Sequence, residues 1–312
     1  MAKVTVVGAG NVGSNTTRRI AEKGLADEVV MIDIVEGLPQ GLALDINQSA
    51  PVEGFRARVT GTNDYAETAG SDVAVITAGL ARQPGMSRMD LLERNAEIVG
   101  SVTEQLVEQS PEAVMIVVSN PLDEMTYLAA LVSGFPKQRV MGMAGVLDSS
   151  RLRFFIAEKL EVAPAAVEAL TLGSHGDQMV ALPRHATVDG TSLPELLDPP
   201  ELDELFARTR DAGAEIVGYL KKGSAFYAPS SSAAAMVAAV VADSDEVMPT
   251  CAWTQGEYGV SDVYLGVPAR LGRGGVKEIV ELDLNEEELS RLREAAEAIR
   301  SKCTELEKAR PS

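Results

Sequence analysis

The first half of the chain alternates short, continuous apolar runs with longer segments whose apolar residues recur every three or four positions. Continuous runs rich in valine and isoleucine are typical of strands that a parallel sheet buries on both faces, and the longer spacing is typical of amphipathic helices. We predict strands at residues 3–7, 28–33, 57–61, 72–77, 113–119 and 138–143. We predict helices at 11–23, 38–49, 89–109 and 121–133. This order indicates an α/β fold with a doubly wound parallel sheet, in which ligands bind outside the carboxyl ends of the strands.

The second half of the chain has a less regular pattern. We predict helices at residues 148–160, 202–221, 231–242 and 286–307. We predict short strands near 167–172, 185–188, 262–267 and 276–280, the last two joined by a glycine-rich hairpin at 266–275. This mixture indicates an α+β domain that packs directly on the first one. We therefore divide the chain into residues 1–145 and residues 146–312.

The composition excludes several classes of protein. A chain of 312 residues with 46% hydrophobic and 24% charged residues is long enough for two domains and too apolar to be disordered. Its two cysteines, Cys251 and Cys303, cannot build a disulfide framework or a Cys/His metal cluster, which favours a reducing compartment. The first residues lack the apolar core of a signal peptide, and the longest apolar run, 233–242, is too short for a membrane helix. We expect a cytoplasmic protein with no membrane partner and no metal.

The chain is strongly acidic. Its formal net charge is −18, from 28 Lys and Arg against 46 Asp and Glu, which argues against nucleic acid as a partner. Only nine of the 28 basic residues are lysines. Such a surface suits a salt-rich cytoplasm, where salt screens self-repulsion, and an ordinary mildly acidic enzyme is the alternative. Equal melting midpoints in low and molar salt would contradict the first interpretation.

A glycine pattern follows the first predicted strand and opens the first helix. Its members are candidate residues for binding a dinucleotide diphosphate: Gly8, Gly10, Asn11, Val12 and Gly13. In such a GxGxxG pattern the glycines allow a tight turn, close approach of the backbone to the diphosphate, and close packing of the helix on the strand. The helix near Asn11 would direct its free N–H groups at the diphosphate.

An acidic residue strengthens this interpretation. Asp33 ends the second predicted strand, 20 residues after Gly13, where a carboxylate hydrogen-bonds the adenosine ribose and repels a 2′-phosphate. The pattern therefore favours NAD over NADP. A glycine turn used only for packing is the alternative, and proteins that bind FAD or S-adenosylmethionine share parts of the signature.

Two histidines occur in the chain. His175 lies in a glycine-flanked polar loop after an apolar run, where an imidazole has room to exchange protons with a substrate. His185 has no such surroundings, and we interpret it as a structural or surface residue. Asp148 and Arg151 lie three positions apart at the start of a predicted helix. Asp148 would orient the imidazole, and Arg151 would bind a carboxylate. The alternative is an N-capping Asp with an ordinary ion pair along the helix.

The segment 77–88 follows a parallel strand, is rich in glycine and proline, and carries two arginines, Arg82 and Arg88. Segments of this kind close as lids over bound ligands, and arginines on a lid suggest an anionic substrate. The alternative is a loop whose arginines face solvent.

Together these motifs resemble the NAD-dependent lactate and malate dehydrogenase family, most closely its lactate-dehydrogenase-like malate dehydrogenase branch. The resemblance covers nearly the whole chain. It is carried by GAGNVG at 8–13, Asp33, ARQPGMSR at 81–88, Asn95, SNPLD at 119–123, LDSSR at 147–151 and GSHGD at 173–177. It implies a Rossmann NAD-binding domain followed by a catalytic domain.

The resemblance also implies roles for single residues. His175 would donate and accept the proton, and Asp148 would hold its tautomer. Arg151 would bind the C1 carboxylate of the substrate, and Arg88 would polarise the ketone oxygen. Asn120 would contact both substrate and cofactor.

Further implied roles concern the cofactor and the choice of substrate. Asn95 and the backbone of Val118 would position the dinucleotide. Arg82 matches the family's specificity position, where arginine suits malate and glutamine suits lactate; a second guanidinium pairs with the second carboxylate of oxaloacetate. A slip of one residue would place Gln83 at this position, but the six-residue interval from Arg82 to Arg88 matches the malate pattern and favours Arg82.

The sequence therefore predicts reversible oxidation of (S)-malate to oxaloacetate with NAD. An L-lactate or other 2-hydroxyacid dehydrogenase is the nearest alternative, and a non-catalytic NAD-binding protein is the alternative from another class. The resemblance further implies a homo-oligomer, a tetramer or alternatively a dimer, acting on a small dicarboxylate.

Overall fold

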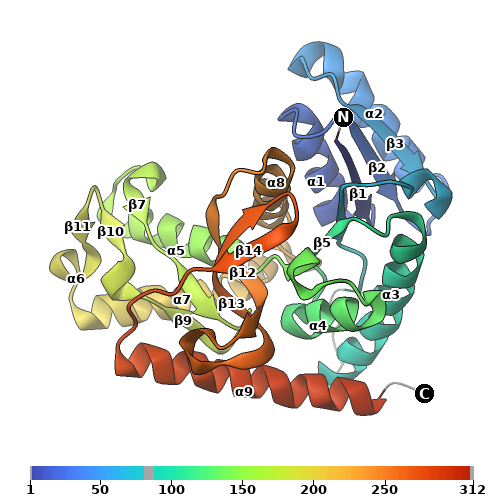
Figure 1. The fold of residues 1–312 in the computed structure, drawn as a ribbon. Coiled ribbons are helices and arrows are strands. Elements are labelled where there is room, and N and C mark those ends of the chain that lie inside the picture. The colour runs from blue at the N-terminus through green and yellow to red at the C-terminus, as the bar shows by residue number, and fades with distance from the viewer. Residues whose placement is uncertain (1, 81–87, 310–312) are drawn as a thin grey trace.

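A computed structural model of the protein describes residues 2–80 and 88–309 (Figure 1). In the first half, parallel strands alternate with helices, as predicted. The strands are β1 (Lys3–Val7), β2 (Glu28–Ile32), β3 (Arg58–Thr62), β4 (Val73–Ile76), β5 (Val114–Val117) and β6 (Val140–Gly142). The helices are α1 (Asn11–Glu22), α2 (Leu38–Glu53), α3 (Arg88–Gln109) and α4 (Leu122–Ser133). Helix α2 runs further than expected and ends where Gly54 adopts a left-handed backbone.

The second half mixes helices with short and long strands. Its helices are α5 (Gly145–Leu160), α6 (Leu193–Leu196), α7 (Pro199–Leu220), α8 (Tyr227–Ala242) and α9 (Glu286–Ala309). Its strands are β7 (Val167–Glu168), β8 (Thr171–Gly173), β9 (Met179–Ala181), β10 (Thr187–Val188), β11 (Thr191–Ser192), β12 (Val247–Gln255), β13 (Ser261–Gly272) and β14 (Gly275–Ile279). Strands β7, β10 and β11 form a separate small sheet.

One sheet continues through both halves of the chain. Its order is β3-β2-β1-β4-β5-β6-β12-β13-β8-β9, with β14 added to β13. The first six strands are parallel, and β12 joins β6 in the antiparallel direction, where Cys251 pairs with Gly142. The strand order reverses between β1 and β4, so the crevice at their carboxyl ends is the expected ligand site of a doubly wound sheet.

The sequence pattern missed β12 and placed one hairpin incorrectly. Strand β12 contains Pro249 and Thr250, which interrupt the apolar run that would have identified it. The hairpin predicted at 266–275 is wrong over most of its length, because β13 continues to Gly272. Gly266 lies inside β13, where a Cβ atom would come within 2.3 Å of the carbonyl oxygen of Gly173. This glycine therefore permits close packing of two strands and does not form a turn.

The parallel part of the sheet is buried on both faces, as the apolar runs indicated. Along β4, Val73 and Val75 belong to one hydrophobic cluster, and Ala74 and Ile76 belong to the other. Helices α1 and α8 contribute to the first cluster, and α3 and α4 contribute to the second. The apolar run 233–242 lies within α8 and is largely buried there. No described helix is long and apolar enough to cross a membrane.

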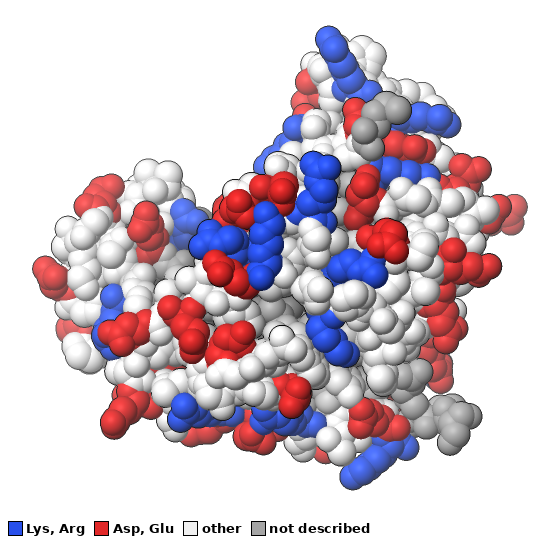
Figure 2. Space-filling view, in the orientation of Figure 1, with Lys and Arg blue, Asp and Glu red and all other residues white. Residues whose placement is uncertain are grey.

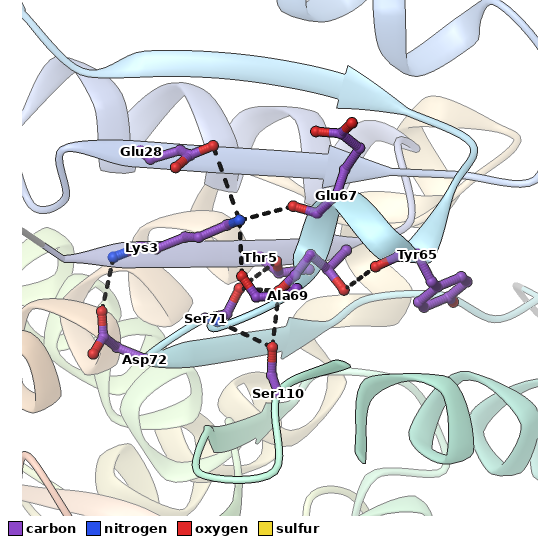
Figure 3. Close-up of polar contacts among 10 residues, drawn as sticks. Lys3, Thr5, Glu28, Tyr65, Glu67, Ala69, Ser71, Asp72 and Ser110 are labelled. Carbon is purple, nitrogen blue, oxygen red and sulfur yellow. Dashed lines mark hydrogen bonds and ion pairs between the residues drawn. The ribbon is translucent and has the colours of Figure 1, made fainter. Parts of the chain in front are cut away.

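A polar network closes the amino ends of the central strands (Figure 3). The Lys3 ammonium donates hydrogen bonds to the carbonyl oxygens of Glu67, at 2.8 Å, and Ala69, at 3.0 Å. The buried hydroxyls of Thr5 and Ser71 lie 2.7 Å apart and link β1 to the segment before β4. These contacts stabilise the end of the sheet that lies opposite to the carboxyl ends of the strands.

The surface charges are spread over several elements. On the face shown in Figure 2, acidic side chains crowd the edge over α3, and acidic and basic side chains are mixed along α9. Several charges on α9 are paired, as in the ion pairs Arg291–Glu287 and Arg300–Glu297. Exposed pairs of this kind contribute little to stability, and they reduce repulsion within an acidic surface.

The close packing at Gly266 makes a stability prediction. In Gly266→Ala, the added methyl group must push β13 away from β8, and we expect a loss of about 1–3 kcal/mol in the free energy of unfolding. Gly218→Ala in α7 is the control, because nothing lies within 4 Å of its added Cβ, and we expect a gain of about 0.5–1 kcal/mol. Thermal melting measures both; equal midpoints for the two variants would contradict the packing argument.

Candidate active site

The turn between β1 and α1 has the geometry of a diphosphate-binding loop. Gly8 has a φ of 100°, in the region that favours glycine, and a Cβ on Gly13 would lie 1.7 Å from the carbonyl oxygen of Gly8. At Gly10, by contrast, an added Cβ would meet nothing within 4 Å, so the backbone is open to a ligand there. Helix α1 begins at Asn11 and has no acidic residue and no side-chain cap in its first turn, which leaves its N–H groups available to an anion.

Asp33 follows β2 directly and lies beside this turn. Its Oδ2 accepts a hydrogen bond from the backbone N–H of Ala9 at 2.6 Å, and its Oδ1 accepts one from Val35 at 2.9 Å. A carboxylate has about four acceptor positions, so two N–H donors leave room for the hydroxyls of a ribose. The glycine loop and Asp33 together fit the adenosine diphosphate half of a dinucleotide.

The fold brings His175 and Asp148 into contact. The His175 Nδ1 lies 2.8 Å from the Asp148 Oδ2, although the two residues are 27 positions apart in the chain. Helix α5 begins at Gly145, so Asp148 is not its N-cap and the capping alternative is wrong. The Asp148 side chain is only 2% exposed, and its second oxygen lies 3.3 Å from Nη1 of Arg151. The buried carboxylate thus joins an imidazole to a guanidinium.

Opposing effects set the proton affinity of His175. Burial alone would lower the pKa of His175, but the charge of Asp148 and its hydrogen bond to the ring, together with the charge of Asp123, raise that pKa above its ordinary value. The charge of Arg151 acts against this rise. The imidazole therefore carries a proton more readily near neutral pH than an isolated histidine, as a proton donor requires.

These residues line a cleft of about 320 Å³ between the two halves of the chain. The residues from the first half are Val12, Val118, Asn120 and Met143. Those from the second half are Leu147, Asp148, Arg151, His175, Gly176, Met179, Arg210, Gly213, Val217, Ser224, Ala225 and Pro229. The Nε of Arg151 is buried and has no hydrogen-bond partner in the described part of the chain. A part-buried guanidinium that lines a cleft favours an anionic ligand.

In the described part of the chain, the side chain of Asn95 hydrogen-bonds the backbone of Leu80 and Asn120. Its Oδ1 accepts a hydrogen bond from the N–H of Leu80 at 2.7 Å, and its Nδ2 donates to the carbonyl oxygen of Asn120 at 2.6 Å. Asn95 therefore connects the end of the segment after β4 to the turn that carries Asn120.

The two arginines of the predicted lid have no described side chain. Arg82 lies outside the residues that the structure describes, and Arg88 is the first residue of α3 with its side chain undescribed. The sequence reasoning assigned no role to two residues that the structure places at the site. Arg210 of α7 lines the cleft, and Asp123 of α4 contacts the backbone of His175. Asp123 lies in the SNPLD motif, which was the available signal; Arg210 carries no motif.

Comparison with protein families gives the class of the chain. The model for the lactate/malate dehydrogenase NAD-binding domain matches residues 2–142, and the model for the α/β C-terminal domain of the same family matches residues 145–309. The chain belongs to the lactate/malate dehydrogenase family. The motif-based prediction of the family and of the fold class is confirmed.

Individual relatives narrow this assignment. The chain is 53% identical to the malate dehydrogenase of Salinibacter ruber, over 99% of this chain and 98% of that protein. It is 54% identical to the malate dehydrogenase of Chloroherpeton thalassium, over 97% of this chain and 98% of that protein. Within the family, the chain therefore belongs to the malate dehydrogenases of the lactate-dehydrogenase-like branch, which are NAD-dependent oxidoreductases.

Solved structures agree in fold. The Salinibacter ruber malate dehydrogenase matches with a TM-score of 0.94 at 51% identity, over 98% of both chains. The Plasmodium falciparum malate dehydrogenase in complex with NADH matches with a TM-score of 0.92 at 31% identity, over 99% of both chains. A Cryptosporidium parvum lactate dehydrogenase, with lactic acid and the dinucleotide, also reaches 0.94 at 40% identity, over 98% of both chains. Fold similarity alone thus does not distinguish the two substrates within this family.

The open backbone at Gly10 makes a prediction about cofactor binding. In Gly10→Ala, the added methyl group meets no protein atom, but it occupies the space through which a diphosphate approaches the loop. We expect an unchanged melting midpoint and an NADH dissociation constant raised at least about tenfold, a loss of about 1.4 kcal/mol. Gly41→Ala in α2, where an added Cβ also meets nothing, is the control and should bind NADH normally. NADH fluorescence titration measures both variants, and normal affinity in Gly10→Ala would contradict the assigned loop.

Proposed function

We propose that the chain oxidises (S)-malate to oxaloacetate reversibly, with His175 as the group that takes and returns the hydroxyl proton. The observation that carries this proposal is the 2.8 Å contact between His175 and the buried Asp148, in a cleft that also holds Arg151. Membership of the malate dehydrogenases supports the choice of substrate. Bound in the first half of the chain, NAD would supply the hydride acceptor for malate oxidation, and NADH would supply the hydride donor for the reverse reaction.

The chain's own residues handle the proton. In malate oxidation, His175 accepts the C2 hydroxyl proton on its Nε2 while Asp148 accepts the hydrogen bond from its Nδ1–H. The carboxylate keeps the ring in one tautomer and stabilises the imidazolium that forms. In oxaloacetate reduction the same imidazolium returns the proton to the oxygen.

Arg151 is the proposed anchor for the C1 carboxylate. Its Nη1 is held by Asp148 at 3.3 Å, whereas its Nε is buried without a partner in the described residues. A guanidinium offers parallel N–H donors that match a carboxylate, and Arg151 lines the cleft, so it can bind a substrate carboxylate there with two hydrogen bonds. Asn120 comes from the first half of the chain and also lines the cleft. It is proposed to contact substrate and cofactor.

Other proposed roles rest on the motifs. Arg88 is proposed to polarise the ketone oxygen, and Arg82 is proposed to pair with the second carboxylate. Residues 1–145 are proposed to bind the cofactor, through Gly8–Gly13, Asp33, Asn95 and Val118. Residues 146–312 are proposed to supply the acid–base pair. We further propose a homo-oligomer, a tetramer or a dimer. The cytoplasm is the proposed compartment, in keeping with two buried cysteines that remain free thiols.

The direct test is NADH oxidation with oxaloacetate and with pyruvate, measured side by side. Because pyruvate would leave one guanidinium unpaired, we expect kcat/KM for oxaloacetate to exceed that for pyruvate by at least about 100-fold. A preference for pyruvate would keep the acid–base mechanism and replace malate by lactate. Binding of NADH without turnover of either substrate would favour a non-catalytic NAD-binding protein.

The acid–base role is tested by His175→Asn. Loss of the proton donor should lower kcat by at least about 100-fold while NADH still binds, because the substitution leaves the cofactor loop unchanged. His185→Asn is the matched control, since the Nε2 of His185 lies 3.1 Å from the carbonyl oxygen of Asp283, away from the cleft residues. Near-normal turnover in His175→Asn would disprove the assignment.

A further inference from the structure

A second carboxylate contacts His175 at its backbone N–H group. The Oδ2 of Asp123, in the first turn of α4, accepts a hydrogen bond from the backbone N–H of His175 at 3.1 Å. The Oδ1 of Asp123 accepts a hydrogen bond from the thiol of Cys251, on β12, at 3.3 Å. Three elements that are distant in the sequence thus meet at one carboxylate.

Burying the charged carboxylate of Asp123 in this position costs free energy. Its side chain is 4% exposed, and burial, together with the neighbouring charge of Glu124, raises the pKa of Asp123 to about 6. The charge of His175 and the two hydrogen bonds act in the other direction. The start of α4 offers partial compensation, because negative charge is favoured near the amino end of a helix. A neutral amide or an apolar residue would avoid most of this cost.

The adjacent residue, Glu124, is a buried acid with a different kind of partner. Glu124 is also buried, but its Oε1 lies 3.4 Å from the ammonium of Lys302 on α9. Among the described residues, Asp123 forms no ion pair with Lys or Arg. Two consecutive buried carboxylates therefore have different partners: a lysine for Glu124, and the His175 loop for Asp123.

We propose that Asp123 is a positioning residue for the reaction: it anchors the backbone of His175, and its negative charge favours the protonated form of the imidazole. This inference rests on the proposed function, which assigns the proton transfer to His175. The His175 ring would then experience two buried carboxylates, Asp148 at the ring nitrogen and Asp123 at the backbone.

Several charged and titratable groups share this region and bear on a pH measurement. From α5 they are Asp148 and Arg151; from α4, Glu124; from β12, Cys251; from α9, Lys302 and Cys303; and from α7, Arg210 at the cleft. The charge of Arg151 opposes the two carboxylates at His175. Removal of one carboxylate therefore shifts the balance toward a neutral imidazole.

Asp123→Asn tests the proposal, because the amide oxygen can still accept the N–H of His175 while the charge is lost. Oxaloacetate reduction needs a protonated His175, so its kcat/KM falls as pH rises through the pKa of that residue. We expect the midpoint of this fall to move about one unit to lower pH, with about a tenfold loss at alkaline pH and little change at acid pH. A merely structural role would lower kcat/KM equally across the pH range and leave the midpoint in place.

The matched control is Glu124→Gln, which makes the same carboxylate-to-amide change at the next buried position. Glu124 is paired with Lys302 and its charge raises the pKa of Asp123, so its loss should lower the melting midpoint and should not move the midpoint of the pH profile to lower pH. A wild-type protein without turnover would refute the proposed function. A wild-type protein with turnover, together with an unshifted profile in Asp123→Asn, would refute only the role of Asp123.

A direct titration gives a readout that does not depend on activity. The chain has two histidines, so a protein with isotope-labelled histidine gives one NMR signal from His175 and one from His185, which His185→Asn assigns. Asp123→Asn should lower the midpoint of the His175 signal by about one unit. An unchanged His175 midpoint would overturn the proposal.

A second variant covers the case in which Asp123→Asn does not fold. Cys251→Ala removes the thiol hydrogen bond to Asp123 but retains the carboxylate. Because that hydrogen bond lowers the pKa of Asp123, its loss should let Asp123 bind a proton at higher pH and so lower the His175 midpoint by a smaller amount. A His175 midpoint identical to that of the wild type would contradict the proposal here too.

Discussion

The pairing of β12 with β6 is the constraint on which the active site depends. Cys251 faces Gly142 in this pair, and a Cβ on Gly142 would lie 2.9 Å from the Cβ of Cys251, so the two strands meet where one residue has no side chain. Through this junction the parallel sheet of the first half continues into the antiparallel strands of the second. The sheet therefore fixes the His175 loop, which follows β8, relative to the turn that carries Asn120.

The charges that line the cleft differ from the net charge of the chain. The surface carries a large excess of acidic residues, whereas the cleft presents the buried guanidinium of Arg151 and the imidazole of His175. Asp148 compensates both cations from one buried carboxylate. Because Asp148 is shared between two cationic groups, an anionic ligand in the cleft would add a second negative partner for Arg151.

The space around each glycine distinguishes those that allow close packing from the one that leaves room for a ligand. At Gly13, Gly142 and Gly266 the neighbouring backbone or side chain leaves no room for a Cβ, so these residues serve packing. At Gly10 nothing lies within 4 Å, so the missing side chain leaves room for a ligand. The GxGxxG pattern indicated the packing role of Gly13 and the open position of Gly10, whereas the packing roles of Gly142 and Gly266 follow only from the coordinates.

The sequence by itself determined the βαβ order, the diphosphate loop and the family, because these depend on local spacing: apolar runs, a GxGxxG turn and short contiguous motifs. It also indicated that Asp148 and His175 act together, through their motifs. The contacts between segments far apart in the chain were determined only by the tertiary structure. Strand β12 was hidden by Pro249 and Thr250, and its position follows from pairing with β6 and β13. The contact between Asp123 and His175 spans 52 positions, and burial and hydrogen bonding that arise only in the folded chain give Asp123 its altered proton affinity.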